Sequence, residues 1–170
     1  MSRMYILHLN TPIEPVDLLK EAYRAIGMEG TESEITVRDR TMGREYTGPS
    51  YDGMFREWSG TPCDGMVIIA ENRVTAHSEI KERFDVDLDK SLFFLISNLE
   101  DFTTQAAHAV KVVSHLLEKY EGDMLFEDTH NVSLIRKAGT IIIDPRISPL
   151  PYGGLDQVKI PYRIAELGPT

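Results

Sequence analysis

Cysteine is almost absent from this sequence, which contains only Cys63. A single thiol excludes an intrachain disulfide framework and any zinc site that needs several cysteines. Long apolar runs are absent too, because none approaches the ~20 residues that span a bilayer. The run between Arg3 and Asn10 is also too short for the core of a signal peptide. We therefore expect a cytoplasmic protein that makes no contact with a membrane.

Positive charge is also scarce. The chain has 18 Lys and Arg residues against 27 Asp and Glu residues, and its net charge is −9. Proteins that bind nucleic acid hold phosphates with basic faces, so this balance argues against a nucleic-acid partner. One interpretation of the acidic charge is that it attracts a basic partner at long range. The other is that it only keeps the protein in solution.

The common motifs of enzymes and cofactor-binding proteins are missing. The sequence has no G-x-G-x-x-G, no P-loop, no G-x-S-x-G and no H-E-x-x-H. The stretch DVDLD begins like a calcium-binding loop, but Lys90 stands where that loop needs glycine and Ile96 where it needs glutamate. The sequence therefore predicts no cofactor, no metal and no enzymatic activity. The remaining enzymatic alternative is a small enzyme that uses Cys63 or a carboxylate–histidine pair.

Three carboxylates and a histidine gather in the stretch EGDMLFEDTHNV. On a regular strand Asp123 and Glu127 would share one face, but they would lie about 13 Å apart, too far to share a metal. Asp128 and His130 stand where a tight hairpin turn favours polar residues. The cluster therefore predicts a turn rather than a metal or acid–base site.

Hydrophobic periodicity predicts an α+β fold in a single domain spanning residues 1–170. Apolar residues at helical spacing indicate two helices, at residues 15–26 and 102–120. Alternating or apolar runs indicate strands in segments 4–10, 33–40, 65–70, 73–77, 84–97, 123–127, 131–137 and 140–144. We expect a mainly antiparallel sheet packed against the two helices, with β-hairpins near the C-terminus. Residues 145–170 are expected to form an extended tail with one edge strand at 157–160.

Residues 41–62 show no regular period and concentrate glycine, proline and aromatic residues. Irregular loops of this length are often functional, and aromatic and arginine side chains dominate binding hot spots. In the alternative interpretation, Phe55 and Trp58 fold back to cap the core. The residues of this loop that we predict to bind a partner are Arg44, Tyr46, Tyr51, Asp52, Phe55, Glu57 and Trp58.

A second candidate for partner binding is the row of aspartates Asp85, Asp87 and Asp89, which alternate with Val86 and Leu88. With a period of two, the aspartates would line one face of a strand and the apolar residues would face the core. Such an acidic ridge is either ordinary solvated surface or a contact for a basic partner.

The two ends of the chain resemble a known family. A helix ending in LLEKYEGDMLFED is followed by the strand VSLIRKAG, with Leu134, Arg136 and Gly139, and then by TIIIDP. This pattern is similar to the ending of the small Sit-type immunity proteins of bacterial polymorphic-toxin systems. The opening YILHLNTPIEPVDLLKEAYRAIG and the closing IPYRIAEL are similar to theirs as well.

The resemblance implies a protein that neutralises a cognate toxin by binding it. We expect the toxin to have a basic active-site cleft for an anionic substrate, such as nucleic acid or a dinucleotide. Carboxylates of the 41–62 loop or of the 85–89 row would then stand in for the phosphates. The alternatives are a scaffold subunit of a larger assembly and the small enzyme described above.

Overall fold

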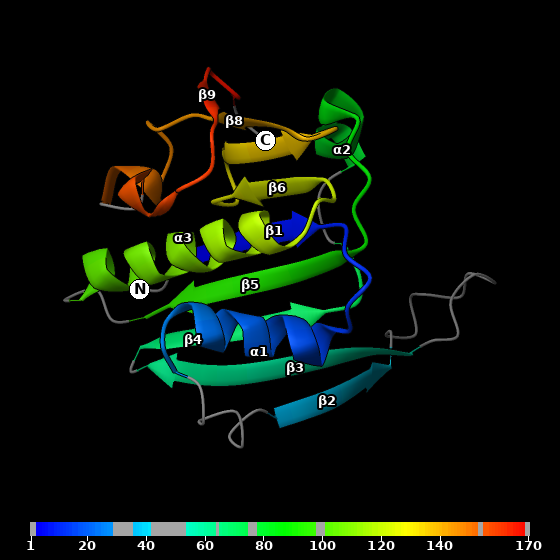
Figure 1. The fold of residues 1–170 in the computed structure, drawn as a ribbon. Helices are drawn as coiled ribbons and strands as arrows, with labels where there is room; N and C mark the ends of the chain where they lie inside the picture. Colours follow the sequence, from blue (N-terminus) through cyan, green and yellow to red (C-terminus); the bar gives the residue numbers. More distant parts are fainter. Residues whose placement is uncertain are drawn as a thin grey trace.

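The computed structural model describes residues 3–28, 36–41, 54–63, 65–74, 78–97, 101–152 and 155–168. A nine-stranded sheet runs through the molecule in the order β2-β3-β4-β5-β1-β6-β7-β8-β9. Helices α1 and α3 cover one face of this sheet, and the short helix α2 lies beside the β6–β8 end (Figure 1). The fold is therefore an α+β domain, as predicted.

Neighbouring strands are antiparallel except for β8 and β9, which are parallel. The strands are β1 (Arg3–Leu9), β2 (Thr36–Thr41), β3 (Met54–Cys63), β4 (Met66–Glu71), β5 (Lys90–Ile96), β6 (Met124–Glu127), β7 (Val132–Lys137), β8 (Thr140–Ile143) and β9 (Arg163–Ile164). Among the described residues, the helices are α1 (Pro15–Ala25), α2 (Ser78–Phe84) and α3 (Phe102–Lys119), and the 3-10 turns are η2 (Leu150–Tyr152) and η3 (Leu155–Gln157).

The main core lies between the sheet and helices α1 and α3. Alternate residues of the central strands, such as Leu7, Phe94 and Phe126, point toward the helices and are fully buried. Both helices occupy the ranges that their apolar spacing predicts, and each ends one residue earlier than expected. The positions of α1 and α3 therefore follow from the local sequence, because the spacing of apolar residues gives each helix one face that can pack against the sheet.

The opposite face of the sheet carries a second, smaller core. Ile80 of α2 packs there against Val86 and Leu88, and against Leu125 and Ile135 of the sheet. Helix α2 was not predicted, because its segment is short and carries no clear apolar period, and its last residue, Phe84, was assigned to the strand expected at 84–97. Of the strand expected at 73–77, Arg73 and Val74 are not part of a strand, and residues 75–77 lie outside the described residues. The long strand expected at 84–97 is also shorter, since only Lys90–Ile96 pair as β5.

The prediction of an irregular loop at 41–62 is wrong for Thr41, the last residue of β2, and for residues 54–62, which belong to β3 between β2 and β4. Two residues that suggested a loop have a structural explanation. A side chain on Gly60 would overlap the ring of Tyr23, so glycine lets β3 approach α1 closely. Pro62 lies where the pairing with β4 shifts between Gly60 and Cys63, and such an irregularity tolerates a missing N–H.

The C-terminal segment differs in detail from an extended tail. It contains η2 and η3, and its edge strand is Arg163–Ile164 rather than 157–160. The predicted hairpins are confirmed. The turn between β7 and β8 places Ala138 and Gly139 at φ 49° and 82°, the geometry of a two-residue turn that matches the twist of the strands.

Candidate functional site

The three aspartates predicted to line one face of a strand are all exposed, although residues 85–89 form no strand and Asp85 has a positive φ of 50°. Asp85 exposes 95% of its side chain and Asp89 exposes 46%, and Asp87 is exposed between them. Val86 and Leu88 are buried, so the predicted alternation is correct although the segment precedes β5 instead of belonging to it. We call Asp85, Asp87 and Asp89 the acidic ridge.

The backbone of the acidic ridge is held in place by its neighbours. Asp87 donates its N–H to Oδ2 of Asp123 at 3.1 Å, and Oδ1 of Asp123 accepts the N–H of Ala138 at 3.2 Å. Asp123 therefore joins the ridge to the β7–β8 turn. Asp85 forms an ion pair of 3.2 Å with Lys137 of β7. In the described part of the chain, the carboxylate of Asp87 has no hydrogen-bond partner.

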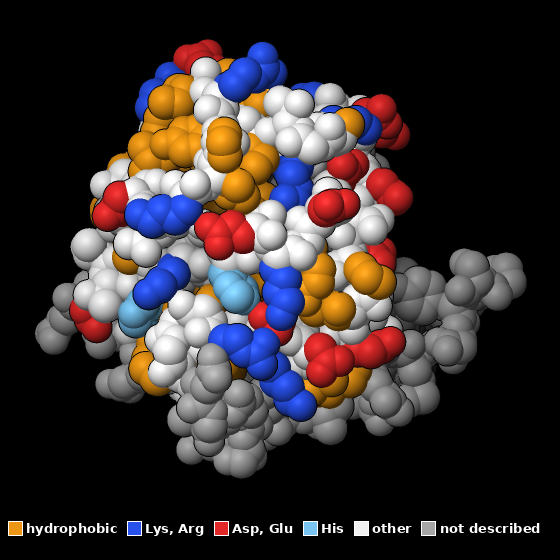
Figure 2. All heavy atoms as spheres, viewed as in Figure 1, with side chains coloured by type: hydrophobic (Ala, Val, Ile, Leu, Met, Phe, Trp, Pro, Cys, Tyr) orange, Lys and Arg blue, Asp and Glu red, His pale blue; other side chains and the backbone are white. Residues whose placement is uncertain are grey.

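Asp89 connects the other end of the ridge to the segment after β1. Its Oδ1 accepts the backbone N–H of Thr11 at 3.2 Å, and its Oδ2 accepts Nζ of Lys90 at 3.0 Å. Asp89 therefore has a structural role, whereas Asp85 and Asp87 present their carboxylates to solvent. Figure 2 shows Asp and Glu side chains along the right-hand edge of the molecule, over the connection between α2 and β5.

The cluster EGDMLFEDTHNV does not form a metal site. Oδ1 of Asp128 accepts the N–H groups of His130 and Asn131 at 2.9 Å and 2.7 Å, as in a polar turn. Asp123 supports the ridge instead, as described above. Across the described residues, no group of three or more His, Cys, Asp and Glu side chains is placed to hold a metal ion. The prediction of a turn is confirmed.

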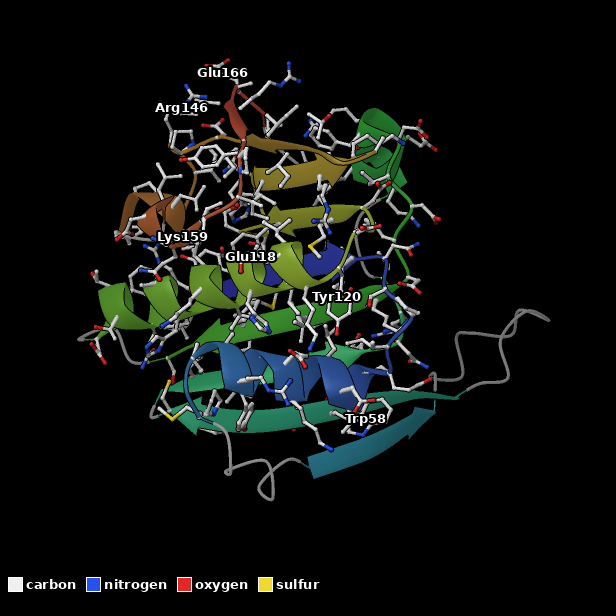
Figure 3. All side chains as sticks on the ribbon, viewed as in Figure 1. Trp58, Glu118, Tyr120, Arg146, Lys159 and Glu166 are labelled. Carbon is white, nitrogen blue, oxygen red and sulfur yellow. The ribbon has the colours of Figure 1, made fainter. Side chains whose placement is uncertain are left out.

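The residues predicted from the 41–62 loop are separated by the structure. Arg44, Tyr46, Tyr51 and Asp52 lie outside the described residues. Phe55 belongs to β3, and Glu57 is buried on the face of the sheet away from α1. Trp58 is half-buried against the main core, near β2 and β3 in Figure 3. The acidic ridge is therefore the predicted site that the structure presents most completely.

A buried polar group that the sequence did not suggest lies in the middle of the sheet. His8 of β1 lies between two partners, with Nδ1 2.9 Å from Oγ of Ser91 and Nε2 3.2 Å from Oε2 of Glu127. Ser91 also faces Glu71 across the β4–β5 pair, and Glu71 faces Glu57. Polar residues of five neighbouring strands, β3, β4, β5, β1 and β6, thus form one row on the face away from α1 and α3.

A serine, a histidine and a carboxylate in series can perform nucleophilic catalysis. Ser91 and His8 are fully buried and Glu127 nearly so, and a substrate cannot reach a hydroxyl without exposed surface. The arrangement satisfies the hydrogen bonds of buried polar groups, which is the ordinary condition of such groups. Sequence reasoning had no signal for it, because the partners of His8 are 83 and 119 residues away in the chain.

Comparisons of this chain with known protein families, with curated proteins and with solved structures found no match. No helix in the described ranges is long and apolar enough to cross a membrane. The resemblance to Sit-type immunity proteins therefore remains a prediction.

Proposed function

We propose that this protein is an immunity protein that binds a cognate bacterial toxin and covers its basic active-site cleft. The single observation that carries the proposal is the acidic ridge, in which Asp85 and Asp87 are exposed on a backbone that Val86 and Leu88 anchor to the smaller core. The family resemblance at the two ends of the chain supports the same class of function.

The physical basis is electrostatic. A rigid row of carboxylates resembles the spaced negative charges of a phosphate chain, so a cleft that binds an anionic substrate attracts it. Charge at an interface mainly raises the association rate, and the effect falls as salt screens it. The fixed backbone of the acidic ridge also favours binding. Val86 and Leu88 are buried and Asp123 holds the backbone, so little conformational entropy is lost when the ridge binds.

The function is tested by co-expression with the product of the adjacent gene. We expect a stable complex after purification, and we expect growth of the host cells to be restored when both proteins are made. A stable homo-oligomer that neither binds this product nor restores growth would contradict the proposal and favour a scaffold subunit.

The role of the ridge is tested with the double variant Asp85→Asn/Asp87→Asn. We expect the association rate constant for the toxin to fall about 3–10-fold at low salt, with a smaller change in the dissociation rate constant. Surface plasmon resonance at several salt concentrations measures both. The matched control Glu118→Gln/Asp156→Asn removes two exposed carboxylates elsewhere. If this control slows association equally, net charge is responsible and the ridge is not the contact.

A further inference from the structure

A groove on the helical face of the molecule is independent of the acidic ridge. It runs between α3 and the C-terminal segment that contains η2 and η3. Two adjacent hollows form it, of about 390 Å³ and about 190 Å³, and Lys111 and Gln157 line both. The larger hollow has a volume typical of small-molecule sites.

The groove is basic although the protein as a whole is acidic. Lys111 projects from α3 and Lys159 from the opposite side, whereas Glu118 is the one carboxylate among the lining residues that the structure describes. Figure 3 shows Lys159 over α3 near Glu118, and Figure 2 shows Lys, Arg and His side chains over this face. Lys159 donates Nζ to the carbonyl oxygen of Asp156 at 2.6 Å, so its ammonium group is positioned without being neutralised.

One end of the larger hollow offers an aromatic surface. Tyr152 is 37% exposed, and its ring meets Phe102 edge-to-face with 5.0 Å between the ring centroids. This contact holds Tyr152 against the first turn of α3. A fixed, partly exposed ring of this kind provides a platform for a planar group at little entropic cost.

His108 lies between the aromatic and the basic parts of the groove. Burial, followed by the charge of Lys111, lowers the pKa of His108, so its ring is neutral near pH 7. Its Nδ1 is buried and has no hydrogen-bond partner among the residues that the structure describes, which leaves Nε2 as the accessible ring nitrogen. A neutral ring with one accessible nitrogen can form a hydrogen bond to a ligand without adding a charge.

We propose that this groove binds a small organic anion in which a planar ring is joined to a phosphate group. The ring lies against Tyr152, and the phosphate is held by Lys111 and Lys159. A nucleoside monophosphate has this chemistry, with its ring in the larger hollow beside Tyr152 and its phosphate at Lys111, which lines both hollows. The site lies away from the acidic ridge, so the inference does not depend on the proposed toxin binding.

The test is an NMR titration of the full-length protein with adenosine monophosphate, adenosine and inorganic phosphate as probes. We expect adenosine monophosphate to shift the backbone signals of α3 and of residues 155–159, with both other probes at least tenfold weaker. If inorganic phosphate binds as tightly as adenosine monophosphate, the aromatic part of the proposal is wrong. If adenosine binds as tightly, the anionic part is wrong. No shift at ~10 mM adenosine monophosphate would overturn the site itself.

Two variants test whether adenosine monophosphate binds in the groove. Lys111→Gln is expected to weaken the binding of adenosine monophosphate about tenfold, while Lys20→Gln, an exposed position on α1, leaves it unchanged. Thermal unfolding of both variants serves as the folding control, because Lys111 is exposed and bears little on stability. Equal affinity of the two variants would show that Lys111 does not hold the phosphate and would contradict the proposed position of the anion.

Discussion

Glu21 is the residue that joins the two large helices. From α1, its carboxylate accepts hydrogen bonds from Nε2 of His115 at 2.7 Å and from Nζ of Lys119 at 2.6 Å, both on α3. It also pairs with Arg24 one turn away. Burial raises the pKa of Glu21, but the hydrogen bonds from His115 and Lys119 outweigh it and lower the pKa to about 2.

The variant Glu21→Gln should therefore be less stable than the wild type. A carboxyl group whose pKa falls from 4.5 to about 2 on folding stabilises the folded state above pH 4.5 and loses this effect as the pH falls toward 2. We expect a loss of about 2 kcal/mol in the free energy of unfolding at pH 7. Urea denaturation at pH 7 and pH 3 measures it. The difference should shrink at pH 3, and the exposed control Glu118→Gln should change stability by less than about 0.5 kcal/mol.

Trp58 gives a second test at the scale of one residue. Its ring packs against the main core from β3 while part of it remains exposed. We expect Trp58→Ala to lower the free energy of unfolding by about 2 kcal/mol, less than for a fully buried tryptophan, and Trp58→Phe to lower it less. Chemical denaturation measures the free energy of unfolding of both variants. Unchanged stability in the alanine variant, together with weaker toxin binding, would assign the ring to the interface instead.

A single side chain connects the C-terminal end of α3 to the β6–β7 hairpin. Arg136 of β7 donates hydrogen bonds to the carbonyl oxygens of Leu117 and Gly122 at 2.7 Å and 2.8 Å, and also to that of Tyr120. The last carbonyl groups of a helix lack partners within it, and a buried arginine satisfies them here. Each residue of the L-x-R-x-x-G pattern thus has a structural role: Leu134 is buried, Arg136 binds these carbonyl groups, and Gly139 forms the next turn.

We therefore expect Arg136→Lys to be nearly as harmful as Arg136→Met. A lysine keeps the charge but lacks the planar fork that reaches three carbonyl groups, so either change should cost about 2–4 kcal/mol of stability. Hydrogen exchange should show faster opening of the C-terminal turn of α3 in both variants. Lys137→Met, at the next and less buried position, is the control. Full stability of Arg136→Lys would show that charge alone is sufficient.

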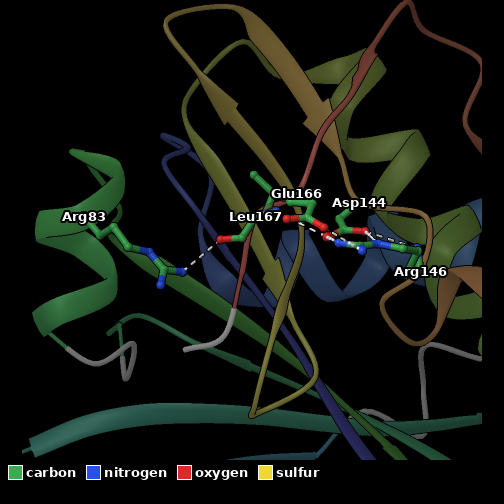
Figure 4. A network of polar contacts seen from close by, with 5 residues as sticks. All are labelled: Arg83, Asp144, Arg146, Glu166 and Leu167. Atoms are coloured by element: carbon green, nitrogen blue, oxygen red, sulfur yellow. Dashed lines mark hydrogen bonds and ion pairs between the residues drawn. The ribbon is translucent and has the colours of Figure 1, made fainter.

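At the scale of the whole molecule, the C-terminal segment is held to the sheet by a network that Figure 4 shows. Asp144 accepts hydrogen bonds from Nε and Nη2 of Arg146, both at 3.0 Å, and from the N–H of Leu167 at 3.2 Å. Arg146 also pairs with Glu166 at 2.7 Å. Arg83 of α2 donates to the carbonyl oxygen of Leu167 at 3.3 Å, so three parts of the chain meet here.

This network predicts that acid releases the C-terminal segment. The hydrogen bond from Arg146 is the main cause that lowers the pKa of Asp144 below its ordinary value of 3.8. The contribution of Asp144 to stability is therefore present above pH 3.8 and is lost as the pH falls below it. Asp144→Asn should cause the same release at pH 7, seen as faster hydrogen exchange of the amides of Ala165 and Leu167. Glu166→Gln, which removes an exposed ion pair, should have a much smaller effect.

The elements that the sequence predicts correctly are those whose signal is local. Helices α1 and α3 and the hairpins β6–β7 and β7–β8 follow from apolar periodicity and from turn residues such as Gly139, because neighbours in the chain are also neighbours in these elements. The acidic ridge was predictable for the same reason. An alternating segment must turn its aspartates outward once Val86 and Leu88 are buried.

Other features depend on residues that are distant in the chain, and no local pattern contains them. Residues 54–63 become β3 because β2 and β4 lie on either side and α1 needs Gly60 beneath Tyr23. His8 meets Ser91 and Glu127 only through the order β5-β1-β6, and the groove beside α3 exists only because the C-terminal segment returns to that helix. Local chain geometry specifies helices, turns and alternation, whereas the packing of the whole chain specifies which side chains become neighbours.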